Sequence, residues 1–354
     1  MADNRILVVG GAGYVGSVLT SELLERGYAV KVLDRLYYGE EGLLDVRDRV
    51  EIVAADMRAL PAAALDDVEA VINLGGLSND PTAEYNPRAN HEMNTTASIK
   101  LAEACIARGV RRYLFASSCS IYDRGVGNDE NDVIQDEASE VAPKAAYSAS
   151  KYAAERALLE MASSKFCPVI LRKGTIYGFS PRMRYDLVVN TFVKDALSKG
   201  FLTLHYGGAM WRPLVDVHDV ARAYIACLAA DESKIGGQIF NLCYRNFRVS
   251  ELALEVRAAL KEAGLDCDIR VDYGYKGVRS YRVSSQKLER ALGVHPVVTV
   301  GEAAKDMVEK IRRYRYTDFD NPKYYNIRWM KMLEEAHKVI RVTGSVFGVG
   351  DGPA

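Results

Sequence analysis

The sequence lacks the charge excess and the long apolar runs that mark two large classes of protein. Its 46 lysines and arginines nearly balance its 47 aspartates and glutamates. A general nucleic-acid binder needs surplus cations to displace counterions from phosphates. No apolar run approaches the roughly 20 residues that span a bilayer, and the first residues carry no signal-peptide pattern. We therefore expect a protein that binds neither nucleic acid nor membrane.

Cysteines are few and show no paired spacing. The six thiols are scattered without a CxxC motif, which argues against a disulfide framework and against a zinc site. Such scatter in a long chain is typical of reduced thiols, so we expect a cytoplasmic protein. Because histidines, cysteines and carboxylates do not cluster, we also expect no bound metal.

What is present is ordinary globular composition arranged in an alternating pattern. Of the 354 residues, 49% are hydrophobic and 26% are charged, and the length allows one large domain or two moderate ones. Short apolar runs alternate with helical patterns, and this alternation predicts βαβ units and a parallel sheet buried on both faces. The predicted strands are residues 5–9, 29–33, 50–54, 70–74, 112–116 and 168–172. The predicted helices between them are residues 14–26, 92–108 and 148–164.

The regularity weakens after about residue 177. Helices are predicted at 186–199, 249–263 and 302–314, and a strand at 239–242 returns to the sheet. We interpret the chain as an α/β protein with a Rossmann-type doubly wound parallel sheet and a smaller, discontinuous substrate-binding domain. In this interpretation residues 1–178 form the cofactor domain, with 213–243 returning to it, while 179–212 and 244–315 form the smaller domain. Residues 316–354 are a C-terminal extension.

A glycine-rich segment follows the first predicted strand. Gly10, Gly13 and Gly16 stand at GxxGxxG spacing, where the strand ends and a helix begins. Glycines let a dinucleotide pyrophosphate approach the backbone, and the helix N-terminus offers free N–H groups and a positive dipole end. The segment, which includes Tyr14 and Val15, therefore predicts a dinucleotide site.

The acidic residue that ends the second predicted strand favours one cofactor. Asp34 can accept hydrogen bonds from both ribose hydroxyls and would repel a 2′-phosphate, which favours NAD over NADP. Arg35 follows directly and could pair with a 2′-phosphate. NADP is therefore the alternative.

The ends of the next two predicted strands extend the same site. Asp56, followed by Met57, closes the third strand, where a carboxylate that contacts adenine would lie. Leu74, Gly75 and Gly76 close the fourth. The two glycines would let the nicotinamide end of the cofactor pass close to the backbone.

A tyrosine and a lysine share one face of a predicted helix. Tyr147 and Lys151 are four residues apart. An ammonium near a phenol lowers the pKa of the phenol, which would let Tyr147 move protons near neutral pH. The strand at 112–116 ends in the serines Ser117, Ser118 and Ser120. Because strand C-termini line the ligand crevice, a serine there can bond the substrate hydroxyl that Tyr147 deprotonates.

These motifs, in this order, resemble those of the extended short-chain dehydrogenase/reductases, in the NAD-dependent nucleotide-sugar epimerase/dehydratase family. Residues 9–16 match the cofactor motif of that family, and Tyr147 with Lys151 matches its catalytic pair. Ser118 falls at its catalytic serine or threonine. Further matches at 171–178 and 212–221 extend the resemblance over about residues 5–300.

The resemblance implies NAD as the cofactor and a nucleotide-diphosphate sugar as the substrate. Asn94 matches the family's asparagine in the helix behind the site, so we expect it, with Ser117, among the cofactor contacts. Arg212 aligns with a phosphate-binding arginine, and a second one is expected at Arg279, with Lys276 and Arg282 as alternatives. The expected substrate contacts are Ser78, Ser118, Ser120, Tyr147, Thr175, Asn190, Arg212 and Arg279.

The resemblance also implies a homodimer. In the family, the helices at 92–108 and 148–164 pair with those of a second subunit as a four-helix bundle. Small side chains on these helices would allow close packing. They are Ala102, Ala104, Ala107, Ala153, Ala154 and Ala157.

The two positions after Ser118 distinguish reactions within the family. Its 4,6-dehydratases carry Asp-Glu there and its glucuronate decarboxylases carry Glu at the second position, whereas this chain has Cys119 and Ser120. The acid/base cysteine of its 3,5-epimerases stands one position later than Cys119. What remains is oxidation and re-reduction at one carbinol carbon, most simply C4 epimerisation. The alternatives are a keto-sugar reductase or dehydrogenase that uses NAD(P), and a non-catalytic NAD-sensing protein.

Overall fold

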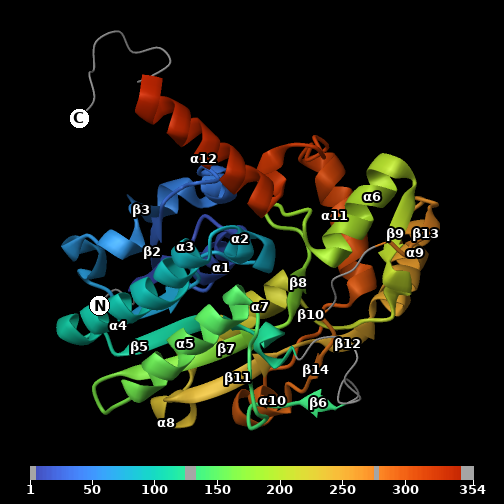
Figure 1. Ribbon diagram of the computed structural model, residues 1–354. Helices are drawn as coiled ribbons and strands as arrows, with labels where there is room; N and C mark the ends of the chain where they lie inside the picture. Colours follow the sequence, from blue (N-terminus) through green and yellow to red (C-terminus); the bar gives the residue numbers. More distant parts are fainter. Residues whose placement is uncertain (1–4, 124–132, 275–278, 344–354) are drawn as a thin grey trace.

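The computed structural model describes residues 5–123, 133–274 and 279–343, and its centre is one large parallel sheet (Figure 1). Seven strands lie in the order β11-β7-β5-β4-β1-β2-β3, and all their pairings are parallel. The strands are β1 (Arg5–Val9), β2 (Ala29–Asp34), β3 (Val50–Ala54), β4 (Ala70–Asn73), β5 (Arg112–Ser118), β7 (Cys167–Lys173) and β11 (Gln238–Leu242). The predicted α/β class and doubly wound Rossmann-type sheet are confirmed.

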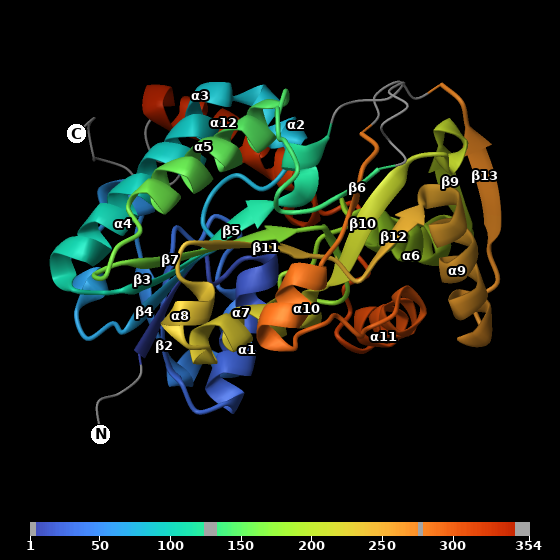
Figure 2. The same ribbon diagram turned by 90° about the horizontal axis from the view of Figure 1, so that it is seen from below.

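Helices cover both faces of this sheet, which explains why its strands are apolar throughout. Figure 2 shows α4 (Ala97–Arg108) and α5 (Ala146–Glu160) on one face, with α1 (Tyr14–Glu25) and α7 (Val217–Ala229) on the other. Successive side chains of a strand point to opposite faces. In β1, Ile6 and Val8 accordingly pack into the core beside α1, and Leu7 and Val9 pack into the core beside α4.

The helix predicted at 92–108 begins earlier and is interrupted. It starts as α3 (Pro87–His91), widens into a π-helical turn at Glu92–Thr96, and continues as α4. Asn86 caps the start, because its side chain accepts a hydrogen bond from the Ala89 N–H. Within the widened turn, Asn94 bonds the backbone of Leu77. The irregular turn thus connects this helix to the loop after β4.

Two of the six alanines expected at a subunit interface lie in the core of the protomer instead. Ala102 and Ala154 are both 0% exposed and pack in the cluster between the helices and the sheet. They face the sheet because the apolar stripe of each helix includes them. Ala107 is exposed, and Ala104, Ala153 and Ala157 are half-buried.

The smaller part of the structure lies beyond the carboxyl ends of the large sheet (Figure 2). Its strands form the sheets β12-β10-β8, β13-β9 and β14-β6. They are β6 (Ile134–Gln135), β8 (Thr175–Tyr177), β9 (Phe201–His205), β10 (Trp211–Asp216), β12 (Arg245–Arg248), β13 (Asp268–Asp272) and β14 (Arg282–Val283). The remaining helices are α2 (Asp80–Tyr85), α6 (Val188–Lys199), α8 (Glu232–Ile235), α9 (Val249–Glu262), α10 (Gln286–Leu292), α11 (Val300–Arg313) and α12 (Asn326–Thr343).

The C-terminal part of the chain returns to the part of the molecule that holds the large sheet. After α11 an aromatic stretch leads into α12, which contacts α2 (Figure 1). Within the described residues no helix is long and apolar enough to cross a membrane. All six cysteines are buried as free thiols.

Candidate active site

A cavity of about 480 Å³ opens at the carboxyl ends of the central strands. It forms there because parallel strands all end at the same edge of the sheet. Most of the predicted site residues line it, although they come from distant parts of the chain. They are Gly10, Gly13, Tyr14, Val15, Gly16, Asp34, Asp56, Met57, Leu74, Gly75, Gly76, Ser78, Ser117, Ser118, Ser120, Tyr147, Lys151, Thr175, Arg212 and Arg279.

The glycine turn is shaped so that no side chain fits. Gly10 has a φ of +78°, in the left-handed region that favours glycine. A Cβ on Gly16 would collide with the Gly10 carbonyl oxygen and with the backbone of Gly11. The turn therefore leaves the first N–H groups of α1 open to the cavity, where an anion is stabilised.

A Gly16→Ala variant should lose cofactor binding. Its Cβ would push the turn away from α1, so we expect NADH affinity, measured by fluorescence titration, to fall at least tenfold. Gly301→Ala is the matched control, because a Cβ there would make only ordinary contacts, the nearest at 3.5 Å to Ala259. An unchanged affinity in a folded Gly16→Ala protein would contradict the assignment of this turn.

Asp34 is held at the end of β2 with its carboxylate fixed by backbone groups. It accepts hydrogen bonds from the N–H groups of Ala12 at 3.0 Å and Leu36 at 2.8 Å. Burial raises the pKa of Asp34, and these bonds together with Arg182 oppose that rise. Arg35, the candidate partner for a 2′-phosphate, forms a 2.8 Å ion pair with Asp56 instead. This arrangement suits the unphosphorylated ribose of NAD.

Asn94 and Asn190, both predicted to touch ligands, are absent from the cavity lining and are 0% exposed. Asn94 bonds the backbone of Leu77 and the Ser150 hydroxyl. Asn190 bonds the backbone of Arg184 and the Tyr14 hydroxyl. Their amides bond groups of the protein itself, so both residues lie behind the cavity wall in this structure, and the ligand contacts expected of them stay predictions.

The catalytic candidates meet where β5 ends and α5 begins. Tyr147 lies in the first turn of α5, where the Ser118 hydroxyl lowers its pKa, and that hydroxyl donates to Ser120 Oγ at 3.0 Å. Lys151 lies one turn further along, 3% exposed, with its Nζ 4.9 Å from the centre of the Phe115 ring. The side chains of Tyr147, Ser118 and Lys151 therefore share one corner of the cavity, whose lining includes both polar and apolar residues.

The electrostatics of this corner differ from the expectation. Burial raises the pKa of Tyr147 to about 12, although Arg184 and the Ser118 hydroxyl oppose the rise. Burial also lowers the pKa of Lys151 to about 8, although Glu155 opposes this. The predicted lowering of the phenol pKa is thus wrong, because desolvation of the phenolate outweighs the effects of Arg184 and Ser118.

A buried ion pair attaches α5 to the sheet beneath these groups. Arg172 on β7 pairs with Glu155 at 2.6 Å, and both side chains are at most 3% exposed. Arg172 also donates to Tyr122 Oη at 2.7 Å, and the Ser117 hydroxyl donates to Glu155. Cys119 lies in this layer, outside the cavity lining, and burial raises the pKa of its thiol.

The two arginines that were expected to bind the substrate diphosphate both line the cavity. Arg212 donates to the Trp211 carbonyl at 2.8 Å and to that of Arg279, while Arg279 forms an ion pair with Asp80. Arg282 is absent from the lining and stacks 4.8 Å from the Trp211 ring. Lys276 lies outside the described residues.

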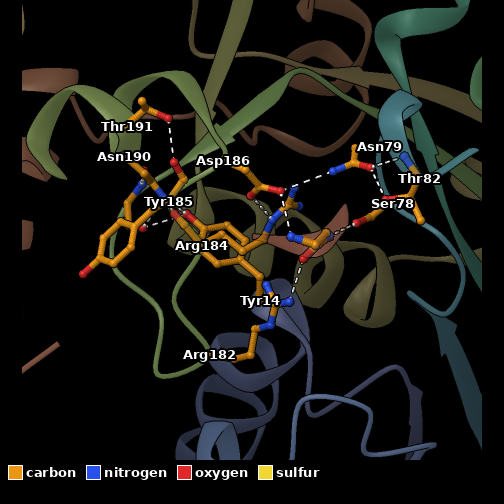
Figure 3. Close-up of polar contacts among 12 residues, drawn as sticks. Tyr14, Ser78, Asn79, Thr82, Arg182, Arg184, Tyr185, Asp186, Asn190 and Thr191 are labelled. Carbon is orange, nitrogen blue, oxygen red and sulfur yellow. Dashed lines mark hydrogen bonds and ion pairs between the residues drawn. The ribbon is translucent and has the colours of Figure 1, made fainter. Parts of the chain in front are cut away.

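Several lining residues were absent from the predicted contacts. Lys173 lies at the end of β7 and donates to Tyr224 Oη at 3.3 Å; burial and Lys151 lower its pKa to about 7. Arg182, Arg184 and Asp186 also line the cavity, and Figure 3 shows the polar contacts around them. The sequence marks this group only by two arginines two residues apart, a spacing that is equally common at surfaces.

Comparisons with known proteins find a family and several relatives that match this chain. A family model described as "NAD dependent epimerase/dehydratase family" matches residues 6–243. A UDP-N-acetyl-alpha-D-glucosaminuronate decarboxylase of Bacillus cytotoxicus is 23% identical over 327 residues, 87% of this chain and 98% of that protein. A UDP-glucose 4-epimerase of Rhizobium meliloti is 34% identical over 166 residues, 45% of this chain and 47% of that protein.

Solved structures share the fold over nearly their whole length. The UDP-glucose 4-epimerase of Thermotoga maritima, with UDP-glucose, is 26% identical with a TM-score of 0.76, covering 88% of this chain and 99% of that one. The UDP-glucuronic acid 4-epimerase of Bacillus cereus, with UDP-glucuronic acid and NAD, is 21% identical with a TM-score of 0.75. The match covers 88% of this chain and 99% of that one.

Proposed function

The chain belongs to the NAD dependent epimerase/dehydratase family, and from this premise we propose that it is a nucleotide-sugar epimerase that uses NAD. In this proposal one sugar carbon, C4, is transiently oxidised and then reduced again from the other face. The observation that carries the proposal is the hydroxyl pair of Tyr147 and Ser118 beside Lys151, in a cavity that fits a dinucleotide.

The positions after Ser118 support epimerisation over the other reactions of the family. Elimination of water needs an acid and a base beside the reacting carbons. Ser120 lines the cavity here, whereas Cys119 points into the protein and its sulfur donates to the Arg172 carbonyl at 3.0 Å. The chain therefore offers neither carboxylate at these two positions, and proton transfer rests on Tyr147.

In the proposed mechanism NAD supplies a hydride acceptor that returns the same hydride, and the protein moves the proton. Tyr147 takes the hydroxyl proton of the carbinol, and Ser118 holds that hydroxyl against the phenol oxygen. Arg184 opposes the rise in the pKa of Tyr147 that burial causes. In the return step Tyr147 gives the proton back, so no external donor is needed.

The residues present fit the cofactor and a nucleotide diphosphate. The open turn at the start of α1 suits a pyrophosphate and Asp34 suits a ribose, as described above. Arg212 and Arg279 supply two cations for the substrate diphosphate, and Ser78, Ser120 and Thr175 face the sugar side. We further propose a homodimer through the outer faces of α4 and α5.

The experiment separates an epimerase from a net oxidoreductase. We expect the purified protein to retain NAD through gel filtration and to isomerise its sugar nucleotide without added cofactor. UDP-, dTDP-, GDP- and CDP-sugars are first compared by thermal stabilisation, since a ligand at 100 times its Kd adds about 2.7 kcal/mol. Stoichiometric consumption of NADH or NADPH would instead identify a keto-sugar reductase, the alternative. NAD binding without any turnover would identify a sensing protein.

A further inference from the structure

Residues 316–343, which we call the C-terminal segment, lie beyond the match to the family model and yet reach the cavity. The family model ends at residue 243. Asn326, Ile327 and Met330, all near the start of α12, line the same cavity as the glycine turn and Asp34. The segment therefore belongs to the wall of the site.

Aromatic packing attaches the segment to the loop before α6, in the smaller part of the structure. Tyr185 lies against the rings of Phe319, Tyr324 and Tyr325, with centroids 5.0–6.5 Å apart. Its N–H donates to the Tyr324 carbonyl at 2.9 Å, and its hydroxyl donates to the Tyr316 carbonyl at 2.7 Å. These contacts fix the path of the chain into α12.

Polar contacts attach the same segment to the residues that follow β2, beside the large sheet. The Trp329 indole N–H donates to the Tyr37 carbonyl, just after β2. Lys323 pairs with Glu41 at 2.7 Å. The segment thus connects the smaller part of the structure with the part that holds the large sheet.

Asn326 contacts three other residues of the cavity wall. Its Nδ2 donates to Ser78 Oγ at 2.7 Å, and its Oδ1 accepts from Arg182 Nη2 at 2.6 Å. Its backbone N–H donates to Asp186 at 3.1 Å. Figure 3 shows Ser78, from the loop before α2, and Arg182 and Asp186, from the loop before α6, directed toward this point. One buried side chain therefore fixes the position of a buried guanidinium.

Arg182 has a donor that the protein leaves unused. The side chain is 7% exposed and stacks 3.6 Å from the centre of the Tyr38 ring, and its Nε has no hydrogen-bond partner within the part of the chain that the structure describes. Burying such a group is costly unless an acceptor is supplied. The protein covers Nε itself, but Arg182 lines the cavity, so the rest of its guanidinium can donate to a bound ligand there.

The surroundings of Arg182 indicate which part of a ligand lies there. The residues just before it pack on the first turn of α1: Tyr14 donates to the Gly178 carbonyl at 2.6 Å, and Ser180 donates to that of Tyr14 at 2.7 Å. On its other side Arg182 stacks on Tyr38, four residues after Asp34, and it opposes the rise in the pKa of Asp34 that burial causes. Arg182 is thus placed between the anion site of α1 and the ribose site of Asp34.

We propose that the C-terminal segment is part of the cofactor site, with Asn326 holding Arg182 so that its guanidinium donates to an oxygen of the adenosine diphosphate half of NAD. The segment thereby slows cofactor release between the two half-reactions. This inference rests on NAD as the cofactor and holds for any sugar substrate.

The test measures NADH release from the full-length protein without a sugar nucleotide. We expect stopped-flow fluorescence to show that Arg182→Met releases NADH at least roughly tenfold faster than the unaltered protein, because a charge-assisted hydrogen bond is lost. Asn326→Ala should accelerate release in the same direction, since it removes the group that positions Arg182. NAD occupancy after gel filtration should fall in both variants.

Two exposed residues provide matched controls. Arg312 on α11 and Glu335 on α12 are exposed and outside the cavity lining, so Arg312→Met and Glu335→Ala should release NADH at the normal rate. A thermal melt checks that every variant is folded. Normal release in folded Arg182→Met and Asn326→Ala would overturn the inference. Because release is measured without turnover, that outcome would leave the proposed epimerase function standing.

Discussion

A Tyr147→Phe variant is expected to lose turnover by at least about a thousandfold while keeping its bound NAD. The change removes one oxygen, the only atom of the ring that can carry the proton, and general acid–base groups contribute about 10²- to 10⁴-fold to rate. The ring itself remains to fill the cavity wall. The loss should therefore lie in kcat rather than in folding or cofactor retention, and both are measurable on the same preparation.

Tyr152→Phe is the matched control, because Tyr152 lies on the same helix but outside the cavity lining. Its turnover should stay near normal. Ser118→Ala should fall between the two, since Ser118 bonds the phenol and does not itself accept the proton. Near-normal activity in Tyr147→Phe would refute the proposed mechanism, whatever the substrate proves to be.

A Glu155→Gln variant is expected to lose about 3 to 5 kcal/mol of unfolding free energy. The change leaves the Arg172 guanidinium, 3% exposed, without a compensating charge in the layer between α5 and β7. The loss should appear as a lower midpoint in urea denaturation with an unchanged slope. Since Glu155 lies one turn after Lys151, the lysine pKa should fall further as well.

The chain offers a matched exposed pair on the same helix. Arg156 and Glu160 are 3.8 Å apart and their side chains are 66% and 73% exposed. Glu160→Gln should change the unfolding free energy by less than about 1 kcal/mol, because water already solvates both charges. A loss in Glu155→Gln as small as this would show that Arg172 is reached by water.

The sheet and the glycine turn could be predicted because each follows from local chemistry. Apolar runs without alternation require burial on both faces, and β1 shows this directly. Glycines at GxxGxxG spacing require a close turn, and the collision of a Gly16 Cβ with Gly10 shows why. Asn94 and Asn190 were placed near the site for good reason, but sequence cannot tell an amide that faces a cavity from one that braces its wall.

What could not be predicted depends on contacts between distant residues. Asn326 and Ser78 are separated by 248 positions, and neither lies in a pattern that marks the other. The pKa of Tyr147 was misjudged because spacing places Lys151 nearby without giving the burial of the phenol. Likewise, the sequence does not show that Arg35 forms an ion pair with Asp56, which occupies the guanidinium that could otherwise bind a phosphate.

The ion pair between Arg279 and Asp80 has a consequence for selection among ligands. Under the proposed function, a diphosphate has to take Arg279 from a carboxylate that already neutralises it. Binding is then an exchange of one anion for another, so part of the attraction is spent in separating the original pair. A free sugar or a nucleoside carries no charge with which to compete. Under the proposed function, this ion pair would therefore select against uncharged relatives of the substrate before the shape of the sugar is tested.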